Sequence, residues 1–334
     1  MSRKFYSSKF GGRQLQHLYR FFQELDQRLK SPRAQHTDVP SICVGNFQAG
    51  GTGKTPTTRW IAQYLSDAGY SPIIVLRGYK GSITAPTLVK DSHSSQEVGD
   101  EALLHAANFP TVVGANRLKA CKLAAQHAAG SSKPVLLLDD GLQHYTLRAD
   151  FNIACTKSPL FWEDTLLPVG RLRQIPVTEK IDAVIAVNSD APTFWEGVPV
   201  YQISQETHNV KGMVAPGLMV AGIAKSSPFF QFLSAHIPGQ TSLSKAFGDH
   251  HIYTANEVRD MEIASAQSNY VVHCTAKDAV KLEPLVSELE SPLQLCVWDV
   301  KTQSNNAAQL LLDAVVAKIE EVYTIRPSKG KQKA

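Results

Sequence analysis

A glycine-rich segment between an apolar run and a helix-forming run constrains this chain more than any other feature. Residues 45–55 read Gly-Asn-Phe-Gln-Ala-Gly-Gly-Thr-Gly-Lys-Thr, follow the apolar residues 41–44 and open a helical pattern over 55–68. Glycines let successive backbone N–H groups point at phosphate oxygens, and the N-terminus of a helix adds favourable partial charge. The order strand, glycine-rich loop, helix therefore predicts a phosphate-binding loop in an α/β fold.

The second half of this loop supplies the predicted ATP-binding residues, Gly50, Gly51, Thr52, Gly53, Lys54 and Thr55. The Lys54 ammonium suits the β- and γ-phosphates, and the Thr55 hydroxyl suits Mg²⁺. Gln48 stands where the usual pattern has its first glycine. The paired glycines at 50 and 51 can supply the same flexibility, so we expect ATP and Mg²⁺ as cofactors.

Apolar runs that alternate with helical patterns extend the prediction to the whole fold. Strand-like runs cover 41–44, 72–76, 135–138, 152–154 and 183–187, with helical patterns over 55–68, 99–107 and 117–129. Crossovers of this length predict a mostly parallel sheet with helices on both faces. A second alternation from 218 to 322 predicts a smaller α/β unit, with a linker near 204–211. We therefore expect three parts: an amphipathic segment 1–37, a P-loop core 38–208 and a smaller domain 209–334.

Charge and cysteine content exclude several classes of protein. The net charge of the 334 residues is only +4, which predicts no nucleic-acid partner. The five cysteines are scattered without a C-x-x-C pair, so no disulfide framework or zinc site is predicted. No uninterrupted apolar stretch of 18 residues occurs, which indicates a cytoplasmic protein that does not cross the membrane.

The N-terminal segment combines positive charge with an amphipathic helical pattern. Residues 1–33 carry eight Lys or Arg against two acidic residues, a net of +6. Residues 13–30 place one apolar stripe at spacings of three and four, Leu15, Leu18, Tyr19, Phe22, Leu25 and Leu29. Such a helix is typical of a membrane interface, but the stripe could equally pack on the protein's own core.

Four further groups of polar residues could bind metal or acceptor. The apolar run 135–138 ends in Asp139, which at this distance behind a phosphate loop is predicted to hold Mg²⁺. Asp100 and Glu101 begin a helix, where helix capping is the alternative to a functional role. An acceptor or metal could contact Asp140, Gln143 and His144, and two arginines on a Pro/Gly loop, Arg171 and Arg173, suit anionic oxygens.

Together these motifs resemble the tetraacyldisaccharide 4′-kinases, the family of lipid A 4′-kinases. The similarity runs from about residue 41 to 282, and its most distinctive block is the Asp-Asp-Gly-x-Gln-His sequence. The shared motifs in chain order are residues 50–56, Arg77-Gly78-Tyr79, residues 98–101, Asn116-Arg117, residues 139–144, residues 167–173, Gly222-Ile223-Ala224, Phe247 with Asp249-His250, and residues 277–281.

The resemblance implies ATP-dependent phosphorylation of the 4′-hydroxyl of tetraacyldisaccharide 1-phosphate. It makes Asp100 the general base, His250 the group that tunes or relays its proton, and Arg117 a clamp on the γ-phosphate, with Lys54 on the phosphates. The implied metal ligands are Thr55, Asp139 and Glu101, and the implied acceptor residues are Asp140, Gln143, His144, Arg171 and Arg173. We expect a monomer that lies peripherally on the inner face of the inner membrane.

Two other functions remain open at this point. A membrane-associated switch ATPase of the partner-positioning type shares the Gly-Gly-x-Gly-Lys-Thr sequence, but such proteins often place Lys ahead of the paired glycines, where this chain has Ala49. A kinase or ligase of small metabolites would need no lipid at all, and would leave the basic amphipathic N-terminus without a purpose. Transfer of phosphate to the lipid acceptor distinguishes these alternatives.

Overall fold

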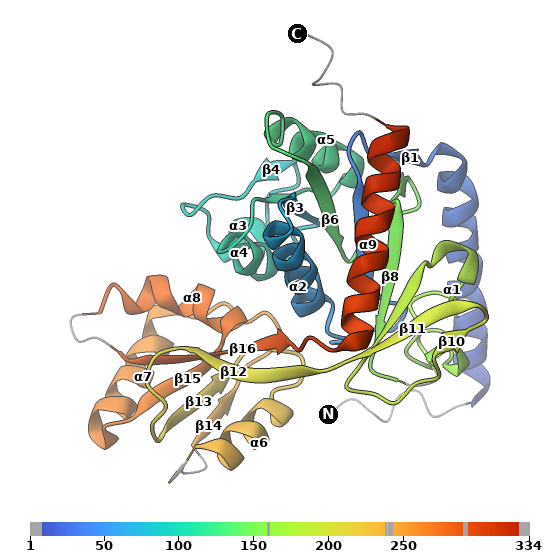
Figure 1. Ribbon diagram of the computed structural model, residues 1–334. Coiled ribbons are helices and arrows are strands. Elements are labelled where there is room, and N and C mark those ends of the chain that lie inside the picture. The colour runs from blue at the N-terminus through green and yellow to red at the C-terminus, as the bar shows by residue number, and fades with distance from the viewer. Residues whose placement is uncertain (1–8, 159–160, 238, 240–242, 290–292, 327–334) are drawn as a thin grey trace.

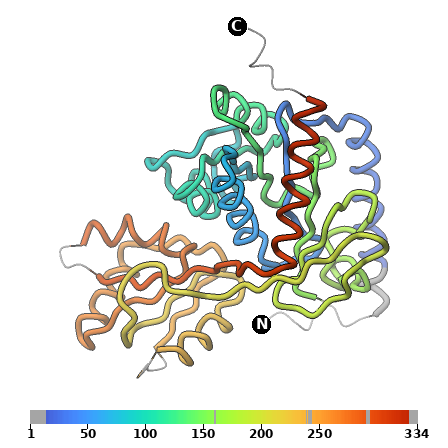
Figure 2. The backbone as a smooth tube through the Cα atoms, in the orientation of Figure 1, coloured from blue at the N-terminus to red at the C-terminus, as the bar shows by residue number. Residues whose placement is uncertain are grey.

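The computed structural model describes residues 9–158, 161–237, 239, 243–289 and 293–326, with side chains from residue 14 onward (Figure 1). Two α/β units make up this part of the chain. Each is built around its own sheet, and the two units lie side by side, joined by a narrow pair of strands (Figure 2).

The first unit contains a nine-stranded sheet that confirms the predicted parallel arrangement. Its interior strands are parallel, and only the two edge pairs, β10 with β11 and β4 with β5, are antiparallel. In spatial order the strands are β10 (Phe194–Trp195), β11 (Val198–Ile203), β9 (Ala183–Val187), β8 (Phe151–Thr156), β2 (Ser41–Gly45), β6 (Pro134–Asp139), β3 (Ser71–Leu76), β5 (Thr111–Val113) and β4 (Thr87–Leu88). A separate short pair joins β1 (Gln35–His36) and β7 (Leu147–Arg148).

Helices cover both faces of this sheet because successive strand residues point to opposite sides. Ile42 packs with α2 (Lys54–Asp67) and α9 (Asn306–Ile325), whereas the next residue, Cys43, packs with α5 (Arg117–His127). Two shorter helices, α3 (Ser95–Val98) and α4 (Asp100–Ala106), lie between β4 and β5 in the chain.

The second unit is a five-stranded sheet with helices on both faces. Its strand order is β12 (Gln205–Lys211), β16 (Leu295–Thr302), β15 (Val271–Thr275), β13 (Gly217–Ala221) and β14 (Ser244–Ala246). One face is covered by α7 (Ala255–Ser268) and α8 (Ala276–Val286), and the other by α6 (Ser227–His236).

The connection between the units differs from the predicted one in two respects. The stretch 204–211, predicted as a linker, forms strand β12, which pairs antiparallel with β16 from Gln205 opposite Thr302 outward. This two-stranded ribbon leads from the first sheet into the second (Figure 1). The predicted boundary, with 209–334 in the smaller domain, is wrong for α9. Its apolar face, including Leu311 and Val315, packs in the first core, so the chain crosses twice.

The predicted amphipathic helix is confirmed as α1 (Lys9–Lys30), which ends where Ser31-Pro32 begins a short 3₁₀ turn. Apart from Tyr19, its apolar stripe does not pack on the protein's own core, since Leu18 is 52%, Phe22 59% and Leu29 62% exposed. Tyr19 instead faces inward and donates a hydrogen bond from its hydroxyl to the backbone oxygen of Arg173. Within the described ranges, no helix has both the length and the apolar character that a bilayer crossing requires.

Candidate active site

The phosphate-binding loop connects β2 to the N-terminus of α2, as predicted. Gly50 and Gly53 have φ values of 111° and 87°. Residues that carry a Cβ adopt this backbone conformation only with strain. Gln48 is buried, and its side chain accepts a hydrogen bond from the Thr156 hydroxyl (3.1 Å) and donates one to the Asp164 carboxylate (3.1 Å). Where the usual pattern has a flexible glycine, this loop therefore has an amide that ties it to the rest of the first unit.

The predicted arginine loop lies against the phosphate-binding loop. Two backbone hydrogen bonds join them, from Ala49 N–H to the Arg171 oxygen (2.7 Å) and from Arg173 N–H to the Phe47 oxygen (2.6 Å). The exposed Arg171 side chain forms an ion pair with Asp164 at 2.9 Å. The arginine loop thus braces the nucleotide side of the site through its backbone.

Asp139 lies at the end of β6 among the groups that a magnesium site needs. The Thr55 hydroxyl is 3.4 Å from its Oδ2, and His105 Nε2 is 2.9 Å from the same atom. Burial would raise the pKa of Asp139, but the hydrogen bond from His105 and the charges of His105, Lys54 and Arg117 hold it below its usual value. The carboxylate is therefore ionised at neutral pH.

The second carboxylate oxygen of Asp139 fits the predicted metal. Oδ1 is buried and has no hydrogen-bond partner within the described part of the chain. A buried, unpaired carboxylate oxygen is costly unless something binds it, and an oxygen ligand beside a threonine hydroxyl is what Mg²⁺ prefers. His105 was missed by sequence reasoning, since a lone histidine within a helical pattern gives no signal of its own.

The Asp140 carboxylate contacts both Lys54 of the phosphate-binding loop and Arg173 of the arginine loop. The Lys54 ammonium is 3.7 Å from Asp140 Oδ1, and Arg173 Nη1 is 3.0 Å from Oδ2. Asp140 has a φ of 55°, the left-handed conformation that turns the chain sharply after β6. Of the predicted acceptor residues, Asp140 and Arg173 therefore lie beside the phosphate-binding lysine.

Arg117 lies behind the strand that carries Asp139. It is 2% exposed, and its Nη2 donates a 2.8 Å hydrogen bond to the Asp139 backbone oxygen. Burial lowers the pKa of Arg117 to about 10, which still leaves the guanidinium charged at neutral pH. Within the described residues its Nε and Nη1 atoms lack partners. The predicted contact with the γ-phosphate stays a prediction.

The predicted base and its histidine meet across the two units. Asp100 begins α4 in the first unit, His250 follows β14 in the second, and His250 Nδ1 lies 2.9 Å from both carboxylate oxygens. Burial would raise the pKa of Asp100, but the hydrogen bond from His250 and the charges of Lys277, His250 and Lys281 hold it below its usual value. Asp100 is thus an ionised, oriented carboxylate between the units.

A buried lysine supports this carboxylate from the second unit. Lys281 Nζ lies 3.7 Å from Asp100 Oδ2 and 3.2 Å from Asp278 Oδ1. Asp278 is fully buried and also accepts hydrogen bonds from the Tyr253 hydroxyl (3.0 Å) and the Gly222 N–H (3.1 Å). Sequence reasoning used Lys281, Asp278 and Gly222 only as parts of motifs, without a role, and did not single out Tyr253.

Glu101, a predicted metal ligand, points into the same interface. Its carboxylate pairs with Lys277 of α8 at 2.5 Å. No contact joins it to Thr55 or Asp139 in the part of the chain described above. The structure therefore does not bring the three predicted metal ligands together, and the role of Glu101 stays a prediction.

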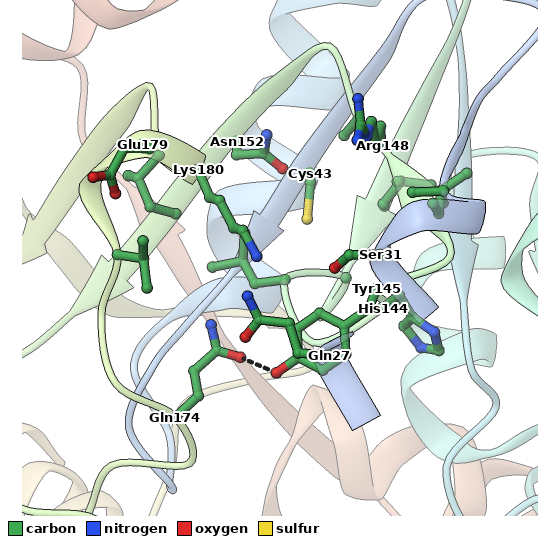
Figure 3. A pocket seen from close by; sticks show the side chains of 18 of the residues that line it. Gln27, Ser31, Cys43, His144, Tyr145, Arg148, Asn152, Gln174, Glu179 and Lys180 are labelled. Carbon is green, nitrogen blue, oxygen red and sulfur yellow. Dashed lines mark hydrogen bonds between the residues drawn. The ribbon is translucent and has the colours of Figure 1, made fainter. Parts of the chain in front are cut away.

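The remaining acceptor residues lie beside a cavity of about 860 Å³ under α1 (Figure 3). Gln143 donates a 2.8 Å hydrogen bond to the Asn46 oxygen of the phosphate-binding loop, and His144 lines the cavity. Burial, with the charges of Arg117 and Arg77, lowers the pKa of His144 to about 4, so the imidazole is neutral at physiological pH. Gly141, Leu142 and His144 of the Asp-Asp-Gly-x-Gln-His block therefore line the cavity.

Comparisons with known proteins agree with this geometry. Residues 13–317 match the model of the family described as LpxK: Tetraacyldisaccharide-1-P 4′-kinase. A tetraacyldisaccharide 4′-kinase of Gluconobacter oxydans is 35% identical over 268 residues, which are 77% of this chain and 80% of the relative. One from Aromatoleum aromaticum is 33% identical over 278 residues, 78% of this chain and 80% of the relative.

The fold has a counterpart among solved structures. LpxK from Aquifex aeolicus in complex with ATP aligns with a TM-score of 0.72 at 23% sequence identity, over 91% of this chain and 97% of that one. The match supports the two-unit α/β architecture. With the family match over nearly the whole chain, it follows that this protein belongs to the tetraacyldisaccharide-1-P 4′-kinase family.

Proposed function

We propose that this protein transfers the γ-phosphate of ATP to the 4′-hydroxyl of tetraacyldisaccharide 1-phosphate, a step of lipid A synthesis. The observation that carries the proposal is the contact between Asp100 and His250 across the two units. Asp100 lies on α4, the helix whose His105 contacts Asp139. A phosphate-binding loop alone would serve any ATPase, but a buried ionised carboxylate near it suits activation of a hydroxyl acceptor.

In the proposed site, the loop amides of Gly50–Gly53 and the Lys54 ammonium bind the β- and γ-phosphates. Thr55 and Asp139 would hold Mg²⁺, which neutralises charge on the phosphates when bound. Arg117 fixes the main chain of Asp139 and would place its free guanidinium nitrogens toward the same charge. These residues position the phosphate and leave the bond-making to the acceptor.

Asp100 takes the proton of the attacking 4′-hydroxyl. His250 donates its Nδ1–H to the carboxylate and so fixes the direction of the accepting oxygen. Because the pKa of Asp100 is low, the carboxylate is ionised at neutral pH. It gains the proton as the hydroxyl oxygen bonds to the γ-phosphorus, while the bond from that phosphorus to the bridging oxygen breaks and ADP leaves. A base so placed contributes about 10²–10⁴-fold to the rate.

The acceptor is proposed to lie between this pair and the cavity under α1. We assign the acceptor contacts to Asp140, Gln143 and His144, of which His144 lines the cavity, and Arg173 beside Asp140 suits an anionic sugar phosphate. Further cations line the cavity itself, Arg28 together with Arg148 and Lys180, which Figure 3 shows. The exposed Arg171, which pairs with Asp164, is proposed to contact the acceptor as well.

The exposed face of α1 is proposed to bind the cytoplasmic surface of the inner membrane, where the lipid acceptor resides. Leu18, Phe22 and Leu29 would enter the interface, while Arg28 and Lys30 approach anionic headgroups. Cosedimentation with anionic vesicles tests this: the double variant Leu18→Ser/Phe22→Ser should lose binding, and equal binding by variant and wild type would remove the membrane role of α1.

The acceptor is tested by transfer of labelled γ-phosphate from ATP to purified tetraacyldisaccharide 1-phosphate. The proposal predicts labelled product that carries a 4′-phosphate. ATP hydrolysis without labelled lipid would favour the switch ATPase, and label on a soluble sugar but not on the lipid would favour a metabolite kinase.

A further inference from the structure

One buried amide joins the ribbon between the units to the phosphate-binding loop. Gln205, the first residue of β12, is 6% exposed. Its Nε2 lies 3.1 Å from the Gly53 oxygen, 3.0 Å from the Thr57 hydroxyl and 3.2 Å from the hydroxyl of Thr302, the last residue of β16. The side chain therefore connects both strands of the ribbon to the loop and to α2.

Gly53 and Gln205 are packed so closely that neither can change freely. A Cβ on Gly53 would lie 2.4 Å from Gln205 Oε1, and the φ of Gly53 is +87°. The backbone of Gln205 is itself held, because its N–H and its oxygen each form a 2.7 Å hydrogen bond with the side chain of Asn188. The amide thus reaches the loop from a fixed base.

The orientation of a peptide group explains why this contact matters for ATP. The Gly53 oxygen and the Lys54 N–H belong to one planar trans peptide, so they point in opposite directions. The Gly53 oxygen accepts the first helical hydrogen bond of α2, from the Thr57 N–H (3.1 Å), and the Gln205 amide adds a second bond that further fixes the direction of the Lys54 N–H. That N–H is among the free donors at the N-terminus of α2, which face a bound phosphate.

A second contact attaches the same helix to the other strand. Arg59 of α2 forms an ion pair with Asp299 of β16, with Nη1 and Oδ2 2.5 Å apart. Both side chains are mostly buried, at 21% and 14% exposure. The phosphate-binding helix and the root of the ribbon therefore form one block, from which the rest of the second unit extends.

We propose that Gln205 is a positioning residue for ATP binding, through which the ribbon that carries the second unit sets the orientation of the Lys54 N–H. The inference rests on the proposed use of ATP and adds to it a residue outside the loop. In this proposal the first residue of β12 positions the phosphate-binding loop, whereas the rest of the ribbon connects the two units.

The test compares Gln205→Ala and Gln205→Glu with Asn209→Ala in the full-length protein. Asn209 lies four residues further along β12, and its amide bonds within the ribbon, to the Lys211 oxygen and Cys296 Sγ at 3.1 Å and to the Val297 oxygen at 3.3 Å. The dissociation constant of Mg–ATP is measured by calorimetry, and KM for the lipid acceptor is measured separately.

Gln205→Ala is expected to raise the dissociation constant about tenfold, the order expected when a buried hydrogen bond is lost. Gln205→Glu should raise it further, because a carboxylate has no N–H to give and repels the Gly53 oxygen. Asn209→Ala should leave it at the wild-type value. The KM for the acceptor should change little in all three.

An unchanged dissociation constant in Gln205→Ala would overturn the proposal, as would an equal rise in Asn209→Ala, which would mean that any loosening of the ribbon suffices. If Gln205→Ala does not fold, Thr302→Val, which removes one partner of the amide, replaces it: a rise of about twofold supports the proposal, and no rise overturns it. Failure of the wild type to bind Mg–ATP would instead refute the proposed function itself.

Discussion

The surroundings of Asp139, called the phosphate side below, differ from the surroundings of Asp100, called the base side. On the phosphate side, every contact of Asp139 comes from the first unit, from Thr55, His105 and Arg117. On the base side, the charged partners of Asp100 come from the second unit, from His250 and Lys281. The proposed metal site at Asp139 therefore depends on the fold of the first unit, whereas Asp100 is oriented only where the two units meet.

A single short helix links these two sides. Helix α4 carries Asp100 at its first position and His105 five residues later. Asp100 and His105, the partner of Asp139, are thus separated by little more than one turn of helix. The comparison predicts that changes beside Asp100 lower the rate of phosphate transfer and spare nucleotide binding. Changes beside Asp139 should weaken the binding of Mg²⁺ and nucleotide.

The largest effect is expected from Asp100→Asn. The amide keeps the shape of the carboxylate but cannot take a proton, so kcat should fall about 10²–10⁴-fold. The dissociation constant of Mg–ATP should stay within about twofold of the wild-type value, because the Asp139 side is untouched. Kinetics and calorimetry on the same preparation check both. Loss of ATP binding would place Asp100 in the metal site and break the comparison.

The phosphate side is tested by His105→Leu. Loss of the ring N–H frees Asp139 Oδ2 to turn, and loss of such a partner typically weakens a metal site by about 10- to 100-fold. Titration of Mg²⁺ against a fluorescent ATP analogue measures the effect. His105→Gln, which offers an N–H of similar reach, should recover most of the affinity. Equal Mg²⁺ affinity in His105→Leu and wild type would show that Asp139 needs no such support.

A smaller effect is expected from Lys281→Met, which removes a charge that the second unit supplies. Turnover should fall about tenfold, as for the loss of one charge-assisted contact. Since Lys281 helps to hold the pKa of Asp100 low, its removal raises that pKa, and the acid limb of kcat/KM moves to higher pH. Lys281→Arg should keep the limb in place. A limb that is the same in Lys281→Met and wild type would separate Lys281 from the base.

The smallest effect concerns stability below neutral pH. The pKa of His144 is about 4 in the folded protein, against roughly 6.5 in an unfolded chain. The unfolded state binds the proton first, so the stability present above pH 6.5 is lost as pH falls toward 4, by roughly 1–3 kcal/mol. Urea unfolding at several pH values should give a flatter profile for His144→Gln. Identical profiles would mean that His144 is not protected by burial.

The local sequence pattern was sufficient to predict most residues of the phosphate side. Strand, loop and helix are consecutive between residues 41 and 67, so periodicity and glycine spacing were sufficient to place Lys54 and Thr55. The end of an apolar strand located Asp139 in the same way. His105 could not be found, because its contact with Asp139 depends on how α4 packs against β6.

The base side and the connection between units lay beyond local pattern. The pairing of Asp100 with His250 was expected from family resemblance alone, since 150 residues separate them. The role of Lys281 depends on Asp278 and Tyr253, which only the folded second unit brings together. Strand β12 looked like a linker because its polar residues 205–211 lie in a ribbon with little apolar cover. Helix α9 returns to the first unit because it covers apolar residues of the nine-stranded sheet. A local sequence pattern does not show which sheet a helix will cover.

The account is tested most directly by a crystal structure with magnesium and a non-hydrolysable ATP analogue. It predicts the terminal phosphates in the loop of residues 45–55 beside Lys54, the metal on Thr55 and Asp139, and Asp100 off the metal but still bonded to His250. A metal bound by Asp100, or phosphates bound away from the loop, would contradict the account.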